Sequence, residues 1–448
     1  MTLNLQEVFT EVAKRVPELG VEKKFKDLSA LSGPPNPDWL DGRVLYEVYP
    51  RAFSEQGNFA ALTERLESLK NIGIEILWLM PVYPIGRKER KGKSGSPYAI
   101  RDYFNVNPEY GSKADFKDLV RRAHRLGMRV IIDMVPNHVA PDFETLHRQP
   151  DLICRDAEGR PKRKVADWSD VVDLDYLNTH TRSFMAEVMQ FWIDEFDVDG
   201  YRCDVAGLVP ADFWEWVIPQ LRKRKSDFYL LAEWESPDLH RVGFNSTYDW
   251  STLRLLRQVF AGETKIDLLA DWILTKSAIY PHNSLPLRFL ENHDLPRARR
   301  LFSGEQLFAA MTLLFSLHGL PLLYNGQEIG TTHRPSLFEK EPIDWKNKDQ
   351  RVFNVVRELI DLRKREPALS SKTYHFDRQA LNRGILAFKK GEECKVIVNL
   401  TDRILPLEQN LISDVKTIVF DSKSAGATQN DLQRLEAYQA VIVKTLKD

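Results

Sequence analysis

Four apolar stretches of the chain end in side chains that can do acid–base chemistry. GYRCDVAG (200–207) places an arginine and an aspartate two positions apart at the end of one stretch, and FYLLAE (228–233) ends in a glutamate. DMVPNHV (133–139) and FLENHD (289–294) add further carboxylates, amides and histidines. A carboxylate that stays ionised beside one that keeps its proton is the pair that nucleophilic and general acid–base catalysis require.

Distant parts of the chain must meet if these side chains are to form one site. From residue 44 on, short apolar runs alternate with stretches of helical periodicity such as 114–127, which Gly127 ends. We predict strands at 44–49, 74–80, 129–135, 198–204, 228–233, 244–250, 287–292 and 320–326. Eight βα units indicate an α/β fold, a closed (β/α)8 TIM barrel whose C-terminal strand ends share one mouth. The polar strand ends then converge on a single pocket.

Asp204 and Glu233 lie one βα unit apart, so the barrel puts them on adjacent strands. Neighbouring strands are about 4.8 Å apart, close to the roughly 5–5.5 Å between the two carboxyl groups of a retaining glycosidase. Arg202 shares the inner face with Asp204, and Cys203 points outward. The arginine holds the aspartate ionised, as an attacking carboxylate requires. The apolar residues before Glu233 are expected to raise its pKa, so that it donates a proton near neutrality.

At these motifs the chain resembles the α-amylase family of glycoside hydrolases and transglycosidases, and the resemblance extends over most of the barrel. It implies Asp204 as the nucleophile, Glu233 as the general acid/base and Asp294 as the stabiliser of the transition state. It also implies contacts to the substrate or to the carboxylates, or support of the pocket, for a second set: Tyr98, Asp102, His138, Arg202 and His293. In this set the tyrosine ring stacks under the apolar face of the sugar.

The chain departs from the family pattern at several positions. Ser96 replaces a histidine that relatives often carry two residues before the stacking tyrosine, and Gly207 and Leu208 replace a histidine or a lysine–histidine pair, so contacts in the outer acceptor subsites differ. Asn137 and Asp173 match positions that bind structural calcium in many relatives. The resemblance therefore implies a structural calcium ion, although the chemistry itself requires no cofactor.

A basic run, GRKERKGK (86–93), follows the second predicted strand. A charge run of this kind is ordinarily a solvated, mobile loop, and that is the expectation here. The alternative is that the loop binds a phosphorylated or extended glucan near the pocket.

The remaining segments are additions to the barrel. We assign residues 42–368 to the barrel, with an excursion at about 139–180 that is too long for an ordinary βα loop. Residues 1–41 are predicted as a helical extension, because their apolar side chains recur at helical spacing. Residues 369–448 are predicted as a small antiparallel β-sandwich domain with strands at 385–390, 394–400, 415–420 and 440–446.

Composition limits the partners of this protein. The 448 residues carry a net charge of −1, which gives no reason to expect nucleic acid or an anionic membrane. No run of 18 apolar residues is present, and Glu7 and Glu11 interrupt the place of a signal peptide. The three cysteines are odd in number and far apart, which favours a reducing, cytoplasmic setting.

Three functions are compared on these observations. The first is a retaining α-glycosidase that cleaves or transfers α-1,4-glucan or maltooligosaccharide units through a covalent glycosyl-aspartate. The second is a non-catalytic carbohydrate-binding homologue, and the third is an unrelated barrel lyase or isomerase that uses a metal. A single carboxylate would be read as an ion pair or a helix cap, but three that converge from separate strand ends favour catalysis.

Overall fold

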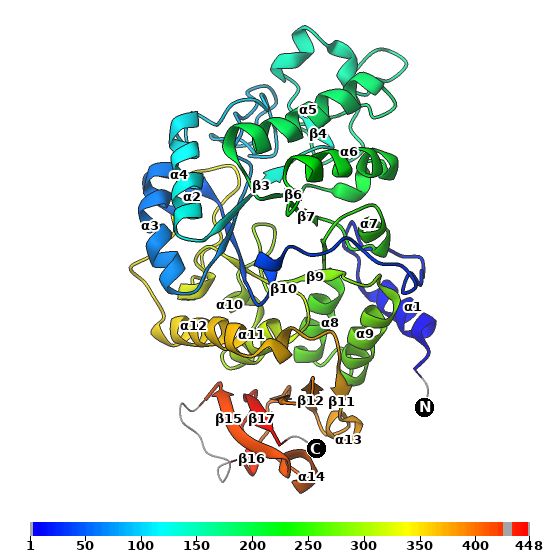
Figure 1. The fold of residues 1–448 in the computed structure, drawn as a ribbon, viewed down its shortest axis with the longest axis vertical. Coiled ribbons are helices and arrows are strands. Elements are labelled where there is room, and N and C mark those ends of the chain that lie inside the picture. Colours follow the sequence, from blue (N-terminus) through cyan, green and yellow to red (C-terminus); the bar gives the residue numbers. More distant parts are fainter. Residues whose placement is uncertain (1–2, 424–431, 447–448) are drawn as a thin grey trace.

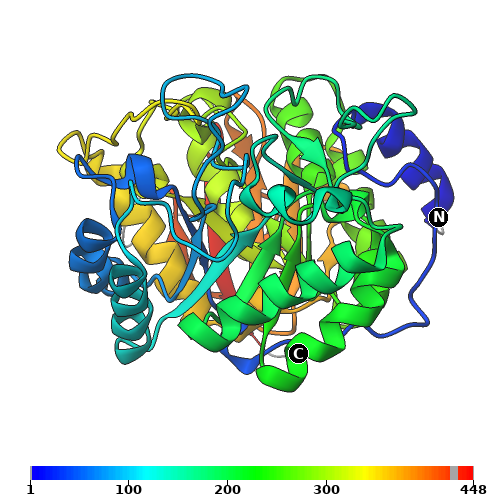
Figure 2. The ribbon, with the colours of Figure 1, turned by 90° about the horizontal axis from the view of Figure 1, so that it is seen from above.

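The main body of the protein is a closed barrel of eight parallel strands (Figures 1 and 2). The structure is a computed structural model that describes residues 3–423 and 432–446. Around the barrel the strand order is β1-β10-β9-β8-β7-β6-β3-β2. The strands are β1 (Leu45–Val48), β2 (Ile76–Leu79), β3 (Arg129–Met134), β6 (Gly200–Cys203), β7 (Tyr229–Ala232), β8 (Ser246–Tyr248), β9 (Leu285–Arg288) and β10 (Leu320–Tyr324). The predicted TIM barrel and all eight of its strands are confirmed.

The boundaries of the seventh barrel strand were predicted wrongly. β9 begins at Leu285 and ends at Arg288, whereas the predicted range was 287–292. Its neighbour β8 is only three residues long and ends at Tyr248, which pairs with Leu287. Residues after Arg288 therefore have no partner on that side and leave the sheet. The motif at 291–294 accordingly lies in the loop beyond the strand, still at the C-terminal mouth.

Helices cover the outside of the barrel and bury apolar side chains against it. The long ones are α3 (Phe59–Asn71), α4 (Lys113–Arg125), α5 (Thr179–Phe196), α6 (Ala211–Arg224), α8 (Trp250–Phe260), α9 (Ile266–Ile279), α11 (Gln306–Ser316) and α12 (Gln350–Arg365). α4 shows why they form: Ser112 and Asp115 make a capping box at its start. Its apolar residues from Phe116 to Ala123 face the core, and Gly127 follows its end with φ +69°.

Short helical turns occupy the loops between these elements. The α-helical ones are α2 (Pro50–Phe53), α7 (Pro237–Arg241) and α10 (Ala298–Leu301). The 3₁₀ turns are η1 (Asp38–Leu40), η2 (Glu144–His147), η3 (Pro150–Leu152), η4 (Ala206–Leu208), η5 (Gln327–Ile329) and η6 (Pro367–Ser370). Figure 2 shows the long connections gathered along one edge of the barrel. That edge is where the strands end.

The N-terminal segment contains one helix, α1 (Leu5–Arg15), which packs against α8 and α9. Phe9 and Val12 on its apolar face are buried, as the helical spacing predicted. The chain then runs back toward the barrel mouth, where Glu235 N–H donates to Gly20 O at 2.7 Å and Glu22 N–H donates to Glu235 O at 2.9 Å. The extension thus contacts the loop that follows β7.

The excursion after β3 is tied down by a small antiparallel ladder. β4 (His138–Val139) pairs with β5 (Val172–Asp173), so the two ends of the excursion lie side by side. The excursion lies with α5 and α6 at the end of the molecule opposite the C-terminal sheet (Figure 1). His138 and Asp173 are paired residues in this ladder.

The C-terminal segment is antiparallel β structure, as predicted, and it consists of one five-stranded sheet and a two-stranded ladder. Its main sheet has the order β11-β12-β13-β17-β15, and β14 pairs with β16. These strands are β11 (His375–Phe376), β12 (Ile385–Lys390), β13 (Cys394–Asn399), β14 (Leu405–Pro406), β15 (Val415–Asp421), β16 (Arg434–Leu435) and β17 (Ala440–Thr445), with short helices α13 (Arg378–Leu381) and α14 (Gln409–Ile412). The predicted domain range, 369–448, includes residues 424–431 and 447–448, which lie outside the described residues.

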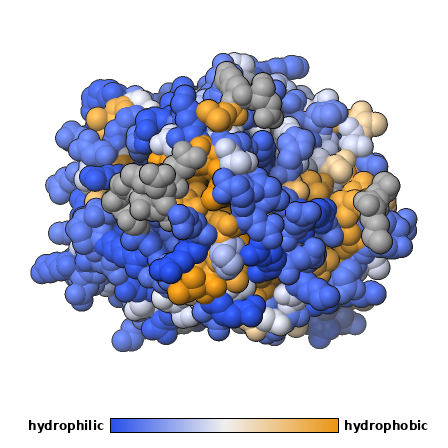
Figure 3. Space-filling model, turned by 90° about the horizontal axis from the view of Figure 1, so that it is seen from below, coloured by the Kyte–Doolittle hydropathy of each residue, from blue (hydrophilic) through white to orange (hydrophobic). Residues whose placement is uncertain are grey.

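The two faces of this sheet belong to different cores, because side chains alternate along each strand. One face joins the main core together with the barrel helices, through residues such as Leu386 and Val396. The other face makes a separate small core that includes Ala387 and Ile397. Seen from this end, the surface is mostly hydrophilic with interspersed apolar areas (Figure 3). Among the described residues, no helix combines the length and the apolar character needed to cross a membrane.

Candidate active site

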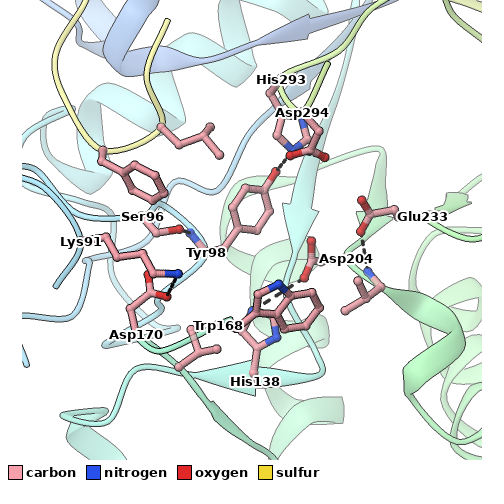
Figure 4. Close-up of a pocket in the computed structure, with 14 residues that line it drawn as sticks. Lys91, Ser96, Tyr98, His138, Trp168, Asp170, Asp204, Glu233, His293 and Asp294 are labelled. Carbon is pink, nitrogen blue, oxygen red and sulfur yellow. Dashed lines mark hydrogen bonds and ion pairs between the residues drawn. The ribbon is translucent and has the colours of Figure 1, made fainter. Parts of the chain in front are cut away.

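A cavity of about 210 Å³ opens at the C-terminal mouth of the barrel. It is lined by Lys91, Ser96, Tyr98, His138, Trp168, Asp170, Val171, Asp204, Val205, Glu233, His293, Asp294, Leu337 and Phe338 (Figure 4). Six of the predicted site residues are in this set: Tyr98, His138, Asp204, Glu233, His293 and Asp294. The barrel therefore brings these six together from five separate segments of the chain.

Asp204 and Glu233 follow neighbouring strands at the same level. In the parallel pair of β6 and β7, Cys203 is the register partner of Ala232, and Glu233 N–H donates to Cys203 O at 3.0 Å. Arg202 lies 2.8 Å from Asp204 Oδ1 through one terminal nitrogen and 2.8 Å from Glu233 Oε1 through the other. The second contact is an ion pair in which the N–H does not point at the oxygen. One guanidinium thus binds both carboxylates, which face the same pocket (Figure 4).

The residue after Asp204 has an unusual backbone conformation. Val205 has φ +37° and ψ +47°, in the left-handed region that a β-branched residue rarely adopts. In this conformation its N–H donates to Glu233 Oε2 at 2.7 Å. Strain of this kind, typically about 1–3 kcal/mol, persists where the surroundings hold a functional geometry. Here the hydrogen bond from the Val205 N–H fixes the orientation of the Glu233 side chain.

Burial raises the pKa of two carboxyl groups at the site, Glu233 and Asp133. It raises the pKa of Glu233 to about 8, against the lowering effect of Arg202, and the nearby Asp204 and Asp294 raise it further. Burial likewise raises the pKa of Asp133 to about 7. Asp133 accepts from Arg202 at 2.8 Å and lies beneath the pocket. Glu233 therefore carries a proton at neutral pH, as its apolar sequence setting predicted.

His293 links the pocket to a buried glutamate on the first strand. Its Nδ1 bonds Glu47, and its Nε2 lies 2.7 Å from the Tyr98 hydroxyl and 3.3 Å from Asp294 Oδ2. Burial by itself lowers the pKa of His293, but the carboxylates of Asp294 and Glu47 outweigh it and raise the pKa to about 9. The ring is thus doubly protonated at neutral pH. The Tyr98 hydroxyl in turn donates to Asp133 Oδ2 at 3.2 Å.

His138 faces Asp204 from the excursion side. Its Nε2 lies 3.8 Å from Asp204 Oδ2, and its ring packs against Trp168 with 5.4 Å between ring centroids. Burial lowers the pKa of His138. The Asn137 amide nitrogen lies 3.2 Å from Nδ1, so in the neutral ring the proton belongs on Nε2, directed toward the pocket.

Two predicted substrate contacts lie elsewhere. Asp102 is not among the residues lining the cavity, because its carboxylate accepts from the N–H of Phe104 at 2.8 Å and from the Asn105 side chain at 2.5 Å, which closes a turn. Arg202 is completely buried beneath the pocket and bonds carboxylates and the Tyr248 hydroxyl. Arg202 was predicted to contact either the substrate or the carboxylates, and in the structure it contacts the carboxylates.

The residues predicted to bind calcium contact a lysine instead. Lys164 donates its ammonium to Asn137 Oδ1 at 3.4 Å and its backbone N–H to Asp173 Oδ2 at 2.7 Å. Calcium needs six to eight oxygen ligands, and an ammonium beside them repels a cation. Within residues 3–423 and 432–446, no group of three or more His, Cys, Asp or Glu side chains is arranged to hold a metal ion. The donor set at this place does not fit calcium.

Several residues of the site were not identified from the sequence. Glu47 gave one usable signal, as a lone charge inside the predicted strand 44–49. Trp168, Asp170, Leu337 and Phe338 come from long loops in which no periodicity points to a pocket. Lys91 belongs to the basic run, which was expected to be solvated.

Comparisons with known proteins point to one family. The family model described as the α-amylase catalytic domain matches residues 47–169. The sequence is 30% identical over 348 residues to α-amylase MalA of Haloarcula japonica, a match that covers 75% of this chain and 50% of that protein. The chain thus spans half the length of that relative.

Solved structures of similar length also match. The α-amylase of Lactobacillus plantarum has a TM-score of 0.81 and 32% identity, with 91% of this chain and all of that chain covered. The noncanonic maltogenic α-amylase AmyB of Thermotoga neapolitana has a TM-score of 0.77 and 32% identity, with 91% and 97% covered.

Proposed function

The chain belongs to the α-amylase family of glycoside hydrolases and transglycosidases, and from this premise we propose that it cleaves or transfers α-1,4-linked glucan or maltooligosaccharide units with retention of anomeric configuration. The observation that carries the proposal is the pair Asp204 and Glu233, in register on adjacent strands, bound by one guanidinium and open to one cavity. Relatives named as amylases support the α-glucan substrate.

In the first step Asp204 attacks the anomeric carbon of the bound sugar. The bond to the leaving oxygen breaks, its electron pair stays on that oxygen, and Glu233 supplies the proton. Arg202, 2.8 Å from Asp204 Oδ1, favours the ionised aspartate. The high pKa of Glu233 keeps the proton available at neutral pH. A covalent glycosyl-aspartate results.

In the second step the deprotonated Glu233 takes a proton from water or from an acceptor hydroxyl. The oxygen of that group attacks the anomeric carbon, and Asp204 leaves as a carboxylate. Water gives hydrolysis and a sugar hydroxyl gives transfer. Ionised Glu233 is held for this role by the N–H of Val205 and by Arg202.

The remaining lining residues bind and orient the sugar in this proposal. Asp294, at the rim of the pocket, accepts from ring hydroxyls, and protonated His293, whose Nε2 lies 3.3 Å from Asp294 Oδ2, holds this carboxylate in place. Neutral His138 donates from Nε2, and the ring of Tyr98 stacks against the apolar face of the sugar. Charge that develops on the ring in the oxocarbenium-like transition state is stabilised by Asp204 and Asp294.

A non-catalytic carbohydrate-binding homologue is the alternative. It has no need of a protonated, buried glutamic acid beside a second carboxyl group that is hydrogen-bonded to arginine, and the arrangement of Glu233 and Asp204 therefore favours catalysis over binding alone. A metal-dependent lyase or isomerase is less well supported, because Asp133 and Asp204 are bound to Arg202, and Glu235 to Lys276, rather than free to coordinate a metal.

Release of reducing ends from maltoheptaose tests the proposal. We expect the wild type to release shorter maltooligosaccharides, and Asp204→Asn to lose at least about 10³-fold in kcat while melting normally. Asp118→Asn, an exposed change on α4, is the matched control and should keep full activity. Substantial turnover by Asp204→Asn, or none by the wild type, contradicts the assignment.

We also propose that the fold needs no calcium near Asn137 and Asp173, because the Lys164 ammonium supplies a positive charge there. A cytoplasmic location stays part of the proposal. It is supported by the three cysteines, all in the described part of the chain and all unpaired.

A further inference from the structure

The end of the pocket opposite Glu233 is lined by side chains that the proposed chemistry does not use. Lys91 Nζ lies 3.0 Å from Asp170 Oδ1 and donates to Asp167 O at 2.9 Å. Figure 4 shows this ion pair on the far side of Tyr98 from Glu233. Asp170 is 5% exposed, and both partners line the cavity. The pair joins the loop after β2 to the excursion after β3.

A buried arginine holds the loop that carries Lys91. Arg51, which is completely buried, donates to Gly95 O at 2.9 Å and to Leu337 O at 3.0 Å. One guanidinium therefore ties the loop after β2 to the loop after β10. Residues 87–90, 92 and 93 are exposed, as expected for a solvated basic run at 86–93. The hydrogen bonds to Arg51 are made just beyond this run, at Ser94 and Gly95.

The same two loops also hydrogen-bond each other directly. Ser94 N–H donates to Phe338 O at 2.9 Å, and Lys93 N–H donates to Glu339 Oε1 at 3.0 Å. Gly92 has φ +64°, and a Cβ there would lie 2.6 Å from Phe338 Cβ. This close approach requires glycine. Phe338 is thereby held in the wall of the cavity, which Lys91 also lines.

The proposed function gives the cavity a direction, and the inference rests on it. Glu233 protonates the departing oxygen, so the leaving part of the chain lies on its side of the pocket. The sugar that bonds to Asp204, and every sugar toward the non-reducing end, extends toward Lys91. We propose that the Lys91–Asp170 ion pair, with Trp168 and Phe338, closes this glycone end. The enzyme then accepts only the non-reducing end of a chain and releases a short product of one fixed length.

Size and charge both support a short, neutral glycone. The cavity of about 210 Å³ is smaller than the roughly 300–1,000 Å³ of sites for drug-sized ligands. Asp170 neutralises Lys91, so the pair offers little net charge to a phosphorylated glucan. A lysine ammonium has three donors, of which one is used in the hydrogen bond to Asp167 O, while the ammonium also forms the ion pair with Asp170. A remaining donor suits a hydroxyl of the terminal sugar.

Two forms of maltoheptaose test the closure, one free and one carrying a 4,6-O-ethylidene group on its non-reducing terminal sugar. The wild type should cleave the blocked form at least about tenfold more slowly than the free form, and should release one product length early in the reaction. Lys91→Ala should bring the two rates closer together and add longer products. Lys88→Ala, an exposed change in the same loop, should leave ratio and products unchanged.

Each outcome decides the matter. Equal rates on both substrates by the wild type overturn the closed end and leave the proposed function intact, whereas cleavage of neither substrate is a failure of the proposed function. Should Lys91→Ala melt at a lower temperature, Lys91→Met keeps the apolar stem and removes only the charge. A Lys91→Met enzyme with the wild-type ratio and product length overturns the role of the ion pair.

Discussion

Replacing Glu233 by glutamine gives the sharpest test of the acid–base assignment. The change keeps the size of the side chain and removes its proton. General acid–base catalysis contributes about 10²–10⁴-fold, so kcat/KM on maltooligosaccharides should fall by that factor. An α-glucosyl fluoride has a leaving group that needs no proton, so its first step should be nearly unaffected by Glu233→Gln.

The raised pKa of Glu233, about 8, also makes the free energy of unfolding depend on pH. It lies above the ordinary 4.5, so the folded protein binds a proton that the unfolded chain releases. The stability that Glu233 contributes is complete below pH 4.5 and is lost as the pH rises through 8. The shift from 4.5 to about 8 corresponds to about 5 kcal/mol as an upper limit. Glutamine has no such loss, so Glu233→Gln should become increasingly more stable than the wild type as pH rises.

Two measurements check this pH dependence. The pH profile of wild-type kcat/KM should fall on its basic side near pH 8, where free Glu233 loses its proton. Urea unfolding of the wild type and of Glu233→Gln at pH 5 and pH 9 gives the stability difference, with Glu187→Gln on the exposed side of α5 as control. Equal loss of activity on the fluoride and on maltooligosaccharides, with a stability difference independent of pH, would refute the reasoning.

Two further changes test the surroundings of the site. Arg202→Met should lower the free energy of unfolding by about 3–5 kcal/mol in urea titrations, because it leaves Asp133 and Asp204 buried without their partner; an unfolding midpoint like that of the wild type would contradict it. EDTA should leave the Tm and the activity unchanged, since Lys164 occupies the place that a cation would need beside Asn137. A Tm that falls with EDTA and recovers with calcium would contradict the second expectation.

The sequence predicted those parts of the site that follow from strand periodicity. Because side chains alternate along a strand and parallel strands end at one edge, the polar ends of four apolar runs had to meet at one mouth. Asp204 and Glu233 follow from this rule, and so does the outward direction of Cys203. The end of β9 could not be predicted from periodicity, because it depends on the length of the neighbouring strand β8.

The tertiary structure decided what surrounds the two carboxylates. Lys91 and Asp170 are nearly 80 residues apart in the sequence and meet only because buried Arg51 fixes one loop and the β4–β5 ladder fixes the other. The Asp102 carboxylate accepts from a backbone N–H instead of facing the pocket, and the Lys164 ammonium lies beside Asn137. Periodicity carries information over a few residues along one strand or helix, whereas the position of a loop side chain depends on which distant groups satisfy its hydrogen bonds and charge. The chain alone therefore determined the central pair of carboxyl groups, and only the packing of three loops determined how the pocket around them is closed.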